Sequence, residues 1–141
     1  MLILLADANS EVLAALRLVL EQKQEYKIVG EVKDTIGIFS QITHHCPDVI
    51  ILDADLHGLK SSRRNSRNPM AELIQTLHML CPTIYIIALS SLPNKEKDCI
   101  QAGANAFFCK SNPPDALFSI LQTAYINLFP SHTDGIQDFV T

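Results

Sequence analysis

Short apolar runs separated by longer amphipathic segments are the feature that most constrains the fold of this chain. The clearest run is Val49-Ile50-Ile51-Leu52, which has no polar position and is therefore expected to be a strand buried on both faces. Further expected strands cover residues 2–6, 28–32, 84–89 and 106–109. Segments with apolar residues at helical spacing follow them at residues 10–20, 36–44, 70–80, 94–102 and 115–128. This alternation of strand and helix predicts parallel strand pairing.

The five strand–helix units predict one α/β domain with a doubly wound, five-stranded parallel sheet and five helices. A flavodoxin-like sheet of this kind has strand order 2-1-3-4-5. Ser10 is the expected N-cap of the first helix. The domain is expected to span residues 1–128, and residues 129–141 are expected to form a loose tail because the sequence after Pro130 is polar and aperiodic.

Composition and charge exclude several classes of protein. A chain of 141 residues with 48% hydrophobic and 18% charged residues is typical of one folded domain with a real core. The net charge of -4 gives no general reason to expect binding to nucleic acid or to an anionic membrane. No apolar stretch is long enough for a membrane span, and the first apolar run lacks the basic flank of a signal peptide. A cytoplasmic location is therefore expected.

The four cysteines give no sign of a metal site or a redox motif. Cys46, Cys81, Cys99 and Cys109 form no CxxC pair and have no histidine at ligand spacing. We expect them to be small core residues. Cys46 and Cys81 share one feature, since each is followed by a proline that ends a helix before an apolar strand.

One short segment departs from the acidic average. Lys60, Arg63, Arg64 and Arg67 are four of the eleven basic residues, which leaves seven basic against fifteen acidic residues in the rest of the chain. The segment that contains them, residues 60–69, is rich in Ser and Asn and is expected to be a mobile loop after the third strand, beside Asp53. It is either a solvated insertion or a site that attracts an anion, such as a phosphoryl donor or an acidic partner surface.

Polar residues at the ends of the expected strands predict a site for phosphoryl chemistry. Asp7 ends the first strand and Asp53 the third, and these strands are neighbours in the expected order. A shared hard cation such as Mg²⁺ would allow the two carboxylates to lie together. Ser90 and Lys110 end the fourth and fifth strands and add a hydroxyl and an ammonium group. Asp53 could then attack a phosphorus atom while Lys110 offsets its charge.

Four sequence blocks resemble the signature blocks of bacterial response-regulator receiver domains, the CheY-like superfamily. The blocks are Leu4-Leu5-Ala6-Asp7, residues 48–58, Ile86-Ile87-Ala88-Leu89-Ser90-Ser91 and residues 102–110. The pattern is most similar to receivers that precede helix-turn-helix output domains. The resemblance implies that Asp53 is the phosphoacceptor, Ser90 the switch hydroxyl and Phe107 the switch aromatic. It also implies that Lys110 contacts the phosphate, and that Asp7, Asp53 and the backbone carbonyl of Asp55 bind Mg²⁺.

The chain departs from the family pattern around the expected metal site. Ala8 stands where the family has a second acid, so Mg²⁺ binding is expected to be weak. Asp55 either compensates in part for this loss or is a solvated loop residue. The turn after it is Leu56-His57-Gly58 instead of Met-Pro-Gly, and Ser111 replaces the usual proline after Lys110.

The expected function is that of a phosphoacceptor receiver in a two-component system. The resemblance implies a sensor histidine kinase or phosphotransfer protein as donor, and an output protein that binds the face of the fourth helix, fifth strand and fifth helix. A homodimer is also possible, whereas direct DNA binding, membrane contact and enzymatic turnover are not expected. Residues after 128 are too few for a helix-turn-helix, so we expect a single-domain regulator or a receiver excised from a longer one. Two alternatives are a phosphorylation-independent receiver that acts by protein contact and a small phosphatase with an aspartyl intermediate.

Overall fold

Five parallel strands form one sheet in the predicted order β2-β1-β3-β4-β5. The computed structural model describes residues 1–56, 58 and 68–130. The strands are β1 (Leu2–Ala6), β2 (Lys27–Val32), β3 (Val49–Asp53), β4 (Tyr85–Ser90) and β5 (Ala106–Cys109). The helices are α1 (Ser10–Leu20), α2 (Thr35–Ile42), α3 (Pro69–Leu80), α4 (Glu96–Gln101) and α5 (Pro114–Leu128), with a 3₁₀ turn η1 (Pro93–Lys95) before α4.

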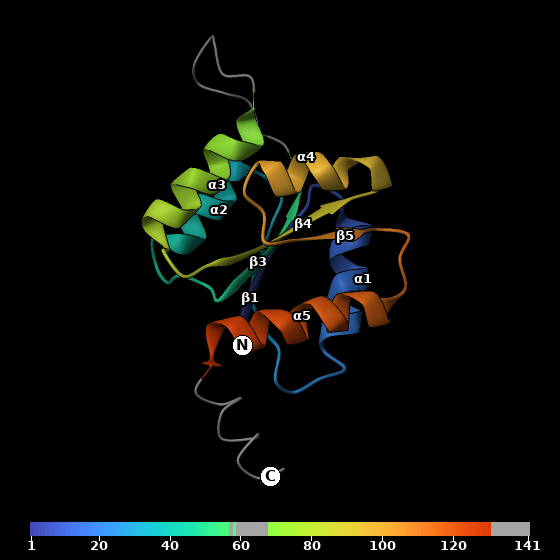
Figure 1. Cartoon of the computed structure of the whole chain (residues 1–141). Coiled ribbons are helices and arrows are strands. Elements are labelled where there is room, and N and C mark those ends of the chain that lie inside the picture. Colours follow the sequence, from blue (N-terminus) through green and yellow to red (C-terminus); the bar gives the residue numbers. More distant parts are fainter. Residues whose placement is uncertain (57, 59–67, 131–141) are drawn as a thin grey trace.

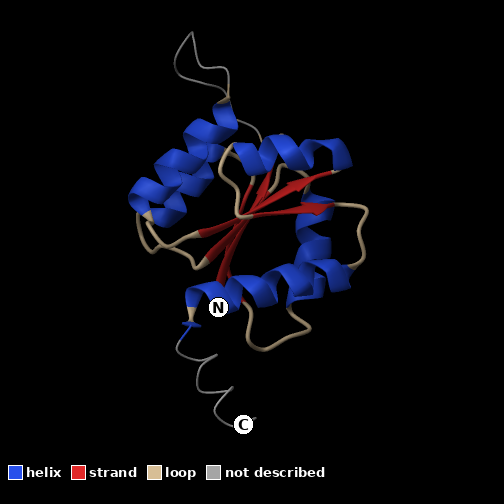
Figure 2. Cartoon of the chain, in the orientation of Figure 1, coloured by secondary structure: helices blue, strands red, loops and turns tan. Residues whose placement is uncertain are grey.

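Helices cover both faces of the sheet, so the fold has three layers (Figures 1 and 2). Helices α1 and α5 pack on one face, where Leu16 and Leu121 are buried against Ile51 of β3. Helices α2, α3 and α4 pack on the other face, where the core includes Ile38 and Leu77. All five residues of β3 are buried, as predicted for a central strand between two helical layers.

The helices differ from the predicted ones mainly in the cap of the first, the end of the second, which is Ile42 and not residue 44, and the length of the fourth. Asn9, and not Ser10, is the N-cap of α1, because the Asn9 side chain accepts hydrogen bonds from the backbone N–H groups of Glu11 and Val12. The Ser10 hydroxyl instead accepts a hydrogen bond of 2.7 Å from Lys33 Nζ. The fourth helix is shorter than residues 94–102, because Pro93 starts a 3₁₀ turn and no side chain caps the following helix.

Parts of the chain for which the sequence made predictions lie outside the described residues. These are residues 60–67 of the insertion predicted at residues 60–69, and the tail at residues 131–141. The domain boundary at residue 128 therefore stays a prediction, although α5 does end at Leu128. The last two residues of the insertion are described and are not loop residues, because Asn68 is the N-cap of α3 and Pro69 is its first residue. No helix in the described part of the chain is long and apolar enough to cross a membrane.

The prediction for the cysteines was right for three residues and wrong for Cys46. Cys81, Cys99 and Cys109 are buried, whereas Cys46 is exposed and forms a disulfide with Cys81. The two cysteines are 35 residues apart in sequence, so a search for short motifs could not pair them. Each precedes one of two adjacent strands, β3 and β4, and this placement was the signal that could have found the pair.

Candidate functional site

Asp7 and Asp53 meet at the carboxyl edge of the sheet, as the strand order predicted. Ala6 of β1 pairs with Leu52 of β3, so the residues that follow each of them are neighbours. Both carboxylates are almost fully buried, with exposed fractions of 1% for Asp7 and 5% for Asp53. Two buried acids side by side need a cation or a proton to offset their repulsion.

The ammonium group of Lys110 supplies that positive charge. Lys110 directly follows β5, and its backbone N–H donates a 2.8 Å hydrogen bond to the Ser90 carbonyl oxygen. From there its Nζ atom lies 2.9 Å from Asp7 Oδ2 and 3.7 Å from Asp53 Oδ1. Residues 7, 53 and 110 are thus brought together from three strands into one charged cluster.

Local turns hold the two carboxylates in place. The backbone N–H of Asn9 donates to Asp7 Oδ1 at 2.8 Å, and that of Asp55 donates to Asp53 Oδ1 at 3.1 Å. The loop after β3 is further fixed by a hydrogen bond of 2.8 Å from the Ala54 N–H to the Leu89 carbonyl oxygen. No described residue donates a hydrogen bond to Asp53 Oδ2, which leaves this oxygen able to form a new bond.

Burial and the neighbouring charges perturb the titration of the cluster. Burial raises the pKa of Asp53, and the Asp7 charge raises it further, while the Asp55 N–H and the Lys110 charge oppose the shift. For Lys110, burial alone would lower the pKa, but its contacts with Asp7 and Asp53 outweigh burial and raise it. Lys110 is therefore held in its charged form between the two acids.

The two residues of the predicted switch lie on the same face of the sheet. Ser90 is fully buried, and its Oγ atom accepts a hydrogen bond of 3.1 Å from the Leu92 N–H. Ser90 pairs with Cys109, and Phe107 pairs with Ala88, so their side chains point to the face covered by α2, α3 and α4. Phe107 is partly buried against the core of that face. Ser90 and Phe107 are therefore on neighbouring strands and on the same face, one diagonal step apart.

The turn after β3 is held by Thr35, a residue that the sequence analysis missed. Gly58 has φ of +84°, a conformation that favours glycine. The Thr35 hydroxyl donates a hydrogen bond of 3.3 Å to the Gly58 carbonyl oxygen, and a Cβ atom at Gly58 would collide with this hydroxyl. Nothing in the local sequence connects Thr35 with Gly58, because 23 residues separate them.

The residues at this edge fit a divalent cation only in part. Asp7 and Asp53 offer two adjacent carboxylates, and the carbonyl of Asp55 is on the neighbouring loop. Within residues 1–56, 58 and 68–130, no group of three or more His, Cys, Asp and Glu side chains is arranged to hold a metal ion. Asp55 is exposed, which favours its interpretation as a solvated loop residue. A site with two acids is expected to hold Mg²⁺ weakly.

Comparison with known families identifies the chain. Residues 3–122 match the family described as "Response regulator receiver domain". The chain therefore belongs to the response-regulator receiver domain family. Members of this family generally bind Mg²⁺ at the phosphorylation site.

Solved structures of other regulators have the same fold. The signal receiver domain of the response regulator NarL from Mycobacterium tuberculosis is 19% identical, with a TM-score of 0.71 over 87% of this chain and 94% of that one. A response regulator from Chloroflexus aurantiacus is 22% identical, with a TM-score of 0.72 over 87% and 95% of the two chains. The isolated receiver domain of RcsB from Salmonella enterica serovar Typhimurium, in the presence of phosphomimetic BeF3-, is 23% identical, with a TM-score of 0.70 over 86% of each chain. At these identities the likeness shows that the fold is shared.

Proposed function

We propose that this chain is a phosphoacceptor receiver that is phosphorylated on Asp53 with the help of Mg²⁺. The donor would be a phosphohistidine of a sensor histidine kinase or phosphotransfer protein in the cytoplasm. The observation that carries the proposal is the buried cluster of Asp7, Lys110 and Asp53 at the carboxyl edge of the sheet. A buried carboxylate beside a fixed ammonium is suited to attack on a phosphorus atom.

The chain's own residues account for most of the transfer step. Asp53 Oδ2 forms a bond to phosphorus as the bond from phosphorus to the donor's imidazole nitrogen breaks, and the imidazole leaves. Lys110 is close enough to neutralise charge on the transferred group, and Ser90 has a hydroxyl hydrogen that it can donate to a phosphoryl oxygen. Asp7, Asp53 and the Asp55 carbonyl would hold Mg²⁺, which supplies further charge neutralisation when bound.

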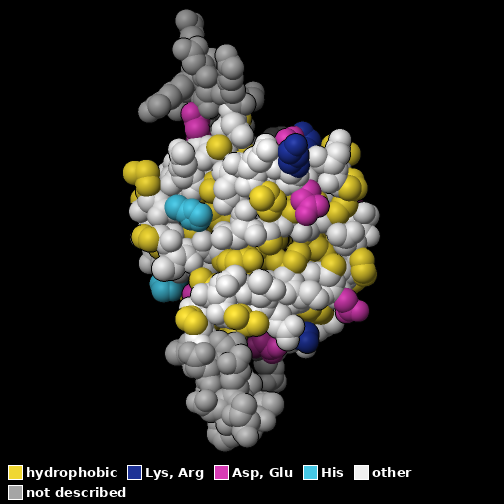
Figure 3. All heavy atoms as spheres, viewed as in Figure 1, with side chains coloured by type: hydrophobic (Ala, Val, Ile, Leu, Met, Phe, Trp, Pro, Cys, Tyr) yellow, Lys and Arg dark blue, Asp and Glu magenta, His cyan; other side chains and the backbone are white. Residues whose placement is uncertain are grey.

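The proposed output surface is the face formed by α4, β5 and α5. Leu92, Ile100 and Ile126 are exposed on or beside these elements, with exposed fractions of 49%, 44% and 48%. Figure 3 shows hydrophobic side chains gathered between α4 and α5 on this side of the molecule. We propose that phosphorylation changes the affinity of this face for an output protein or for a second copy of the chain.

The direct test is mass spectrometry after incubation with acetyl phosphate and Mg²⁺. The wild type should gain one acid-labile phosphoryl group, and Asp53→Asn should gain none. Asp55→Asn is the matched control, because it removes an exposed carboxylate two positions away and should still be modified. An adduct that persists in Asp53→Asn would overturn the assignment of the phosphoacceptor.

A second candidate is a receiver that acts by protein contact without phosphorylation. Ala8 at the family's acidic position favours it, since the missing carboxylate weakens the metal site. Absence of any adduct in the wild type, from acetyl phosphate or from a phosphorylated histidine donor, would support this candidate.

We further propose that the chain is not an enzyme with a separate substrate, because Asp55, the only acid near Asp53 on the same loop, is exposed to solvent. Turnover of generic phosphate esters would contradict this and favour the phosphatase alternative.

A further inference from the structure

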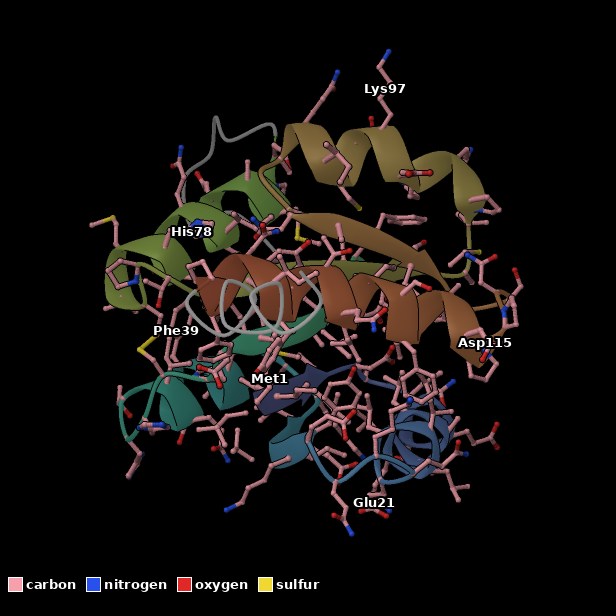
Figure 4. All side chains as sticks on the ribbon, turned by 60° about the horizontal axis from the view of Figure 1, so that its bottom comes forward. Met1, Glu21, Phe39, His78, Lys97 and Asp115 are labelled. Atoms are coloured by element: carbon pink, nitrogen blue, oxygen red, sulfur yellow. A yellow bond between two sulfur atoms is a disulfide. The ribbon has the colours of Figure 1, made fainter. Side chains whose placement is uncertain are left out.

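The disulfide between Cys46 and Cys81 lies at the edge of the sheet opposite the phosphoacceptor. Cys46 is in the loop before β3 and Cys81 caps the end of α3, with a Cα–Cα distance of 5.7 Å. In Figure 4 the yellow bond between two sulfur atoms joins the region of α2, near the labelled Phe39, to the end of α3. Asp53 is at the far end of β3 from this bond. The disulfide is thus separate from the proposed phosphorylation site.

The sheet holds the two cysteines close together without help from the bond. Val49 and Tyr85 are paired residues of β3 and β4, and the Tyr85 N–H donates a 2.9 Å hydrogen bond to the Asp48 carbonyl oxygen. These contacts fix both strands just after the cysteines. The Cys81 N–H also donates to the Leu77 carbonyl oxygen at 2.7 Å, which anchors it to α3. A reduced pair would therefore remain in place, ready to form the bond again.

The two cysteines differ in their exposure to solvent, and Cys46 has a hydrogen-bond acceptor nearby. Cys46 is exposed, whereas Cys81 has an exposed fraction of 2%. Attack by an external thiolate is therefore directed to Cys46 Sγ. This sulfur atom lies 3.5 Å from the Leu80 carbonyl oxygen, which can accept a hydrogen bond from the thiol that forms on reduction.

We propose that Cys46 and Cys81 form a reversible thiol–disulfide site that responds to low-molecular-weight thiols such as glutathione. In the reducing direction, a thiolate bonds to Cys46 Sγ, the Cys46–Cys81 bond breaks, and Cys81 leaves as a thiolate that takes up a proton. A second thiolate then attacks the external sulfur of the mixed disulfide, which releases Cys46 and the oxidised donor. A cytoplasmic location, which is part of the proposed function, makes a permanent disulfide exceptional and a responsive one the expected type.

The oxidised bond should stabilise the fold and leave the phosphoacceptor unaffected. It closes a segment of 35 residues that contains β3 and α3, and this restricts the unfolded chain. The oxidised form should unfold roughly 10 °C higher than the reduced form. Asp53 should be modified at the same rate in both forms, because its hydrogen bonds and ion pair come from Asp55 and Lys110.

Equilibration of the full chain in glutathione buffers tests the proposal. Samples are quenched in acid, unfolded and alkylated, and the number of free thiols is counted by mass spectrometry. As the ratio of oxidised to reduced glutathione rises, the number of free thiols contributed by Cys46 and Cys81 should fall from two to none. A chain with Cys99→Ala and Cys109→Ala should show the same transition, and Cys46→Ser should show neither the transition nor the redox-dependent shift in unfolding temperature.

The outcomes separate this proposal from the proposed phosphorylation. A pair that stays reduced at every ratio, or stays oxidised in excess reduced glutathione, would overturn the redox site. Neither readout involves phosphate, so the result stands even if Asp53 is never phosphorylated. If Cys46→Ser does not fold, Cys46→Ala and Cys81→Ala provide the same comparison.

Discussion

Lys110 is paired more closely with Asp7 than with Asp53, since its Nζ atom is 2.9 Å from Asp7 Oδ2 and 3.7 Å from Asp53 Oδ1. The lysine is therefore anchored by the acid that is not the proposed nucleophile. Asp53 receives only part of the stabilisation that an ion pair can give, and burial raises its pKa. We therefore expect the stability of the fold to depend on all three side chains.

Replacement of Lys110 by Met should destabilise the protein at neutral pH. The change leaves two buried carboxylates without their cation, and because Lys110 is partly exposed we expect a loss of about 2 kcal/mol, less than for a fully buried pair. The free energy of unfolding can be measured with urea. Lys97→Met is the matched control, because the Lys97 side chain extends from α4 into solvent (Figure 4) and should change stability little. Equal losses in both variants would show that Lys110 does not stabilise the acids.

Replacement of Asp53 by Asn should stabilise the protein at neutral pH by about 1 kcal/mol, because it removes a buried negative charge. The folded wild type has a raised Asp53 pKa and binds this proton more tightly than the unfolded chain. Its stability therefore falls as pH rises from the ordinary aspartate pKa, about 3.9, through the raised value in the folded state. Asn cannot ionise, so the advantage of the variant should disappear below that range.

Urea unfolding at a series of pH values checks this dependence, with Asp55→Asn as the control for loss of an exposed carboxylate. If Asp53→Asn is less stable than the wild type at pH 7, the attraction between Asp53 and Lys110 outweighs the cost of burial. The argument that burial destabilises the charged form of Asp53 would then be wrong.

Replacement of Ala8 by Asp should tighten Mg²⁺ binding about tenfold, because a third carboxylate adds charge beside Asp7 and Asp53. Titration of the metal-free protein with Mg²⁺ measures the change. Ala14→Asp is the matched control, because it adds the same charge at an exposed position of α1. Equal affinity in Ala8→Asp and the wild type would mean that the missing acid does not limit the site.

The sequence predicted those features that follow from a local pattern or from the strand order. The apolar run at residues 49–52 predicted a buried strand, and the predicted strand order placed Asp7 and Asp53 at the ends of neighbouring strands. The pairing of Lys110 with Asp7 could not be predicted, because it depends on how a long side chain crosses the ends of β4 and β3. The N-cap at Asn9 was missed because Asn and Ser are nearly equal in capping strength and stand next to each other.

The last prediction concerns the coupling between Ser90 and Phe107. If Ser90 turns toward a phosphoryl group, it breaks its hydrogen bond with the Leu92 N–H and opens space on the face of the sheet that Phe107 shares. Phe107 has no hydroxyl group that could fix either rotamer, so we expect only modest changes of the backbone amide resonances in α4, β5 and α5 when beryllofluoride binds. Nuclear magnetic resonance spectra with and without the anion measure them. Phe107→Tyr should enlarge the changes and Ser90→Ala should reduce them, whereas identical spectra of the wild type with the anion bound would show that this receiver has no such switch.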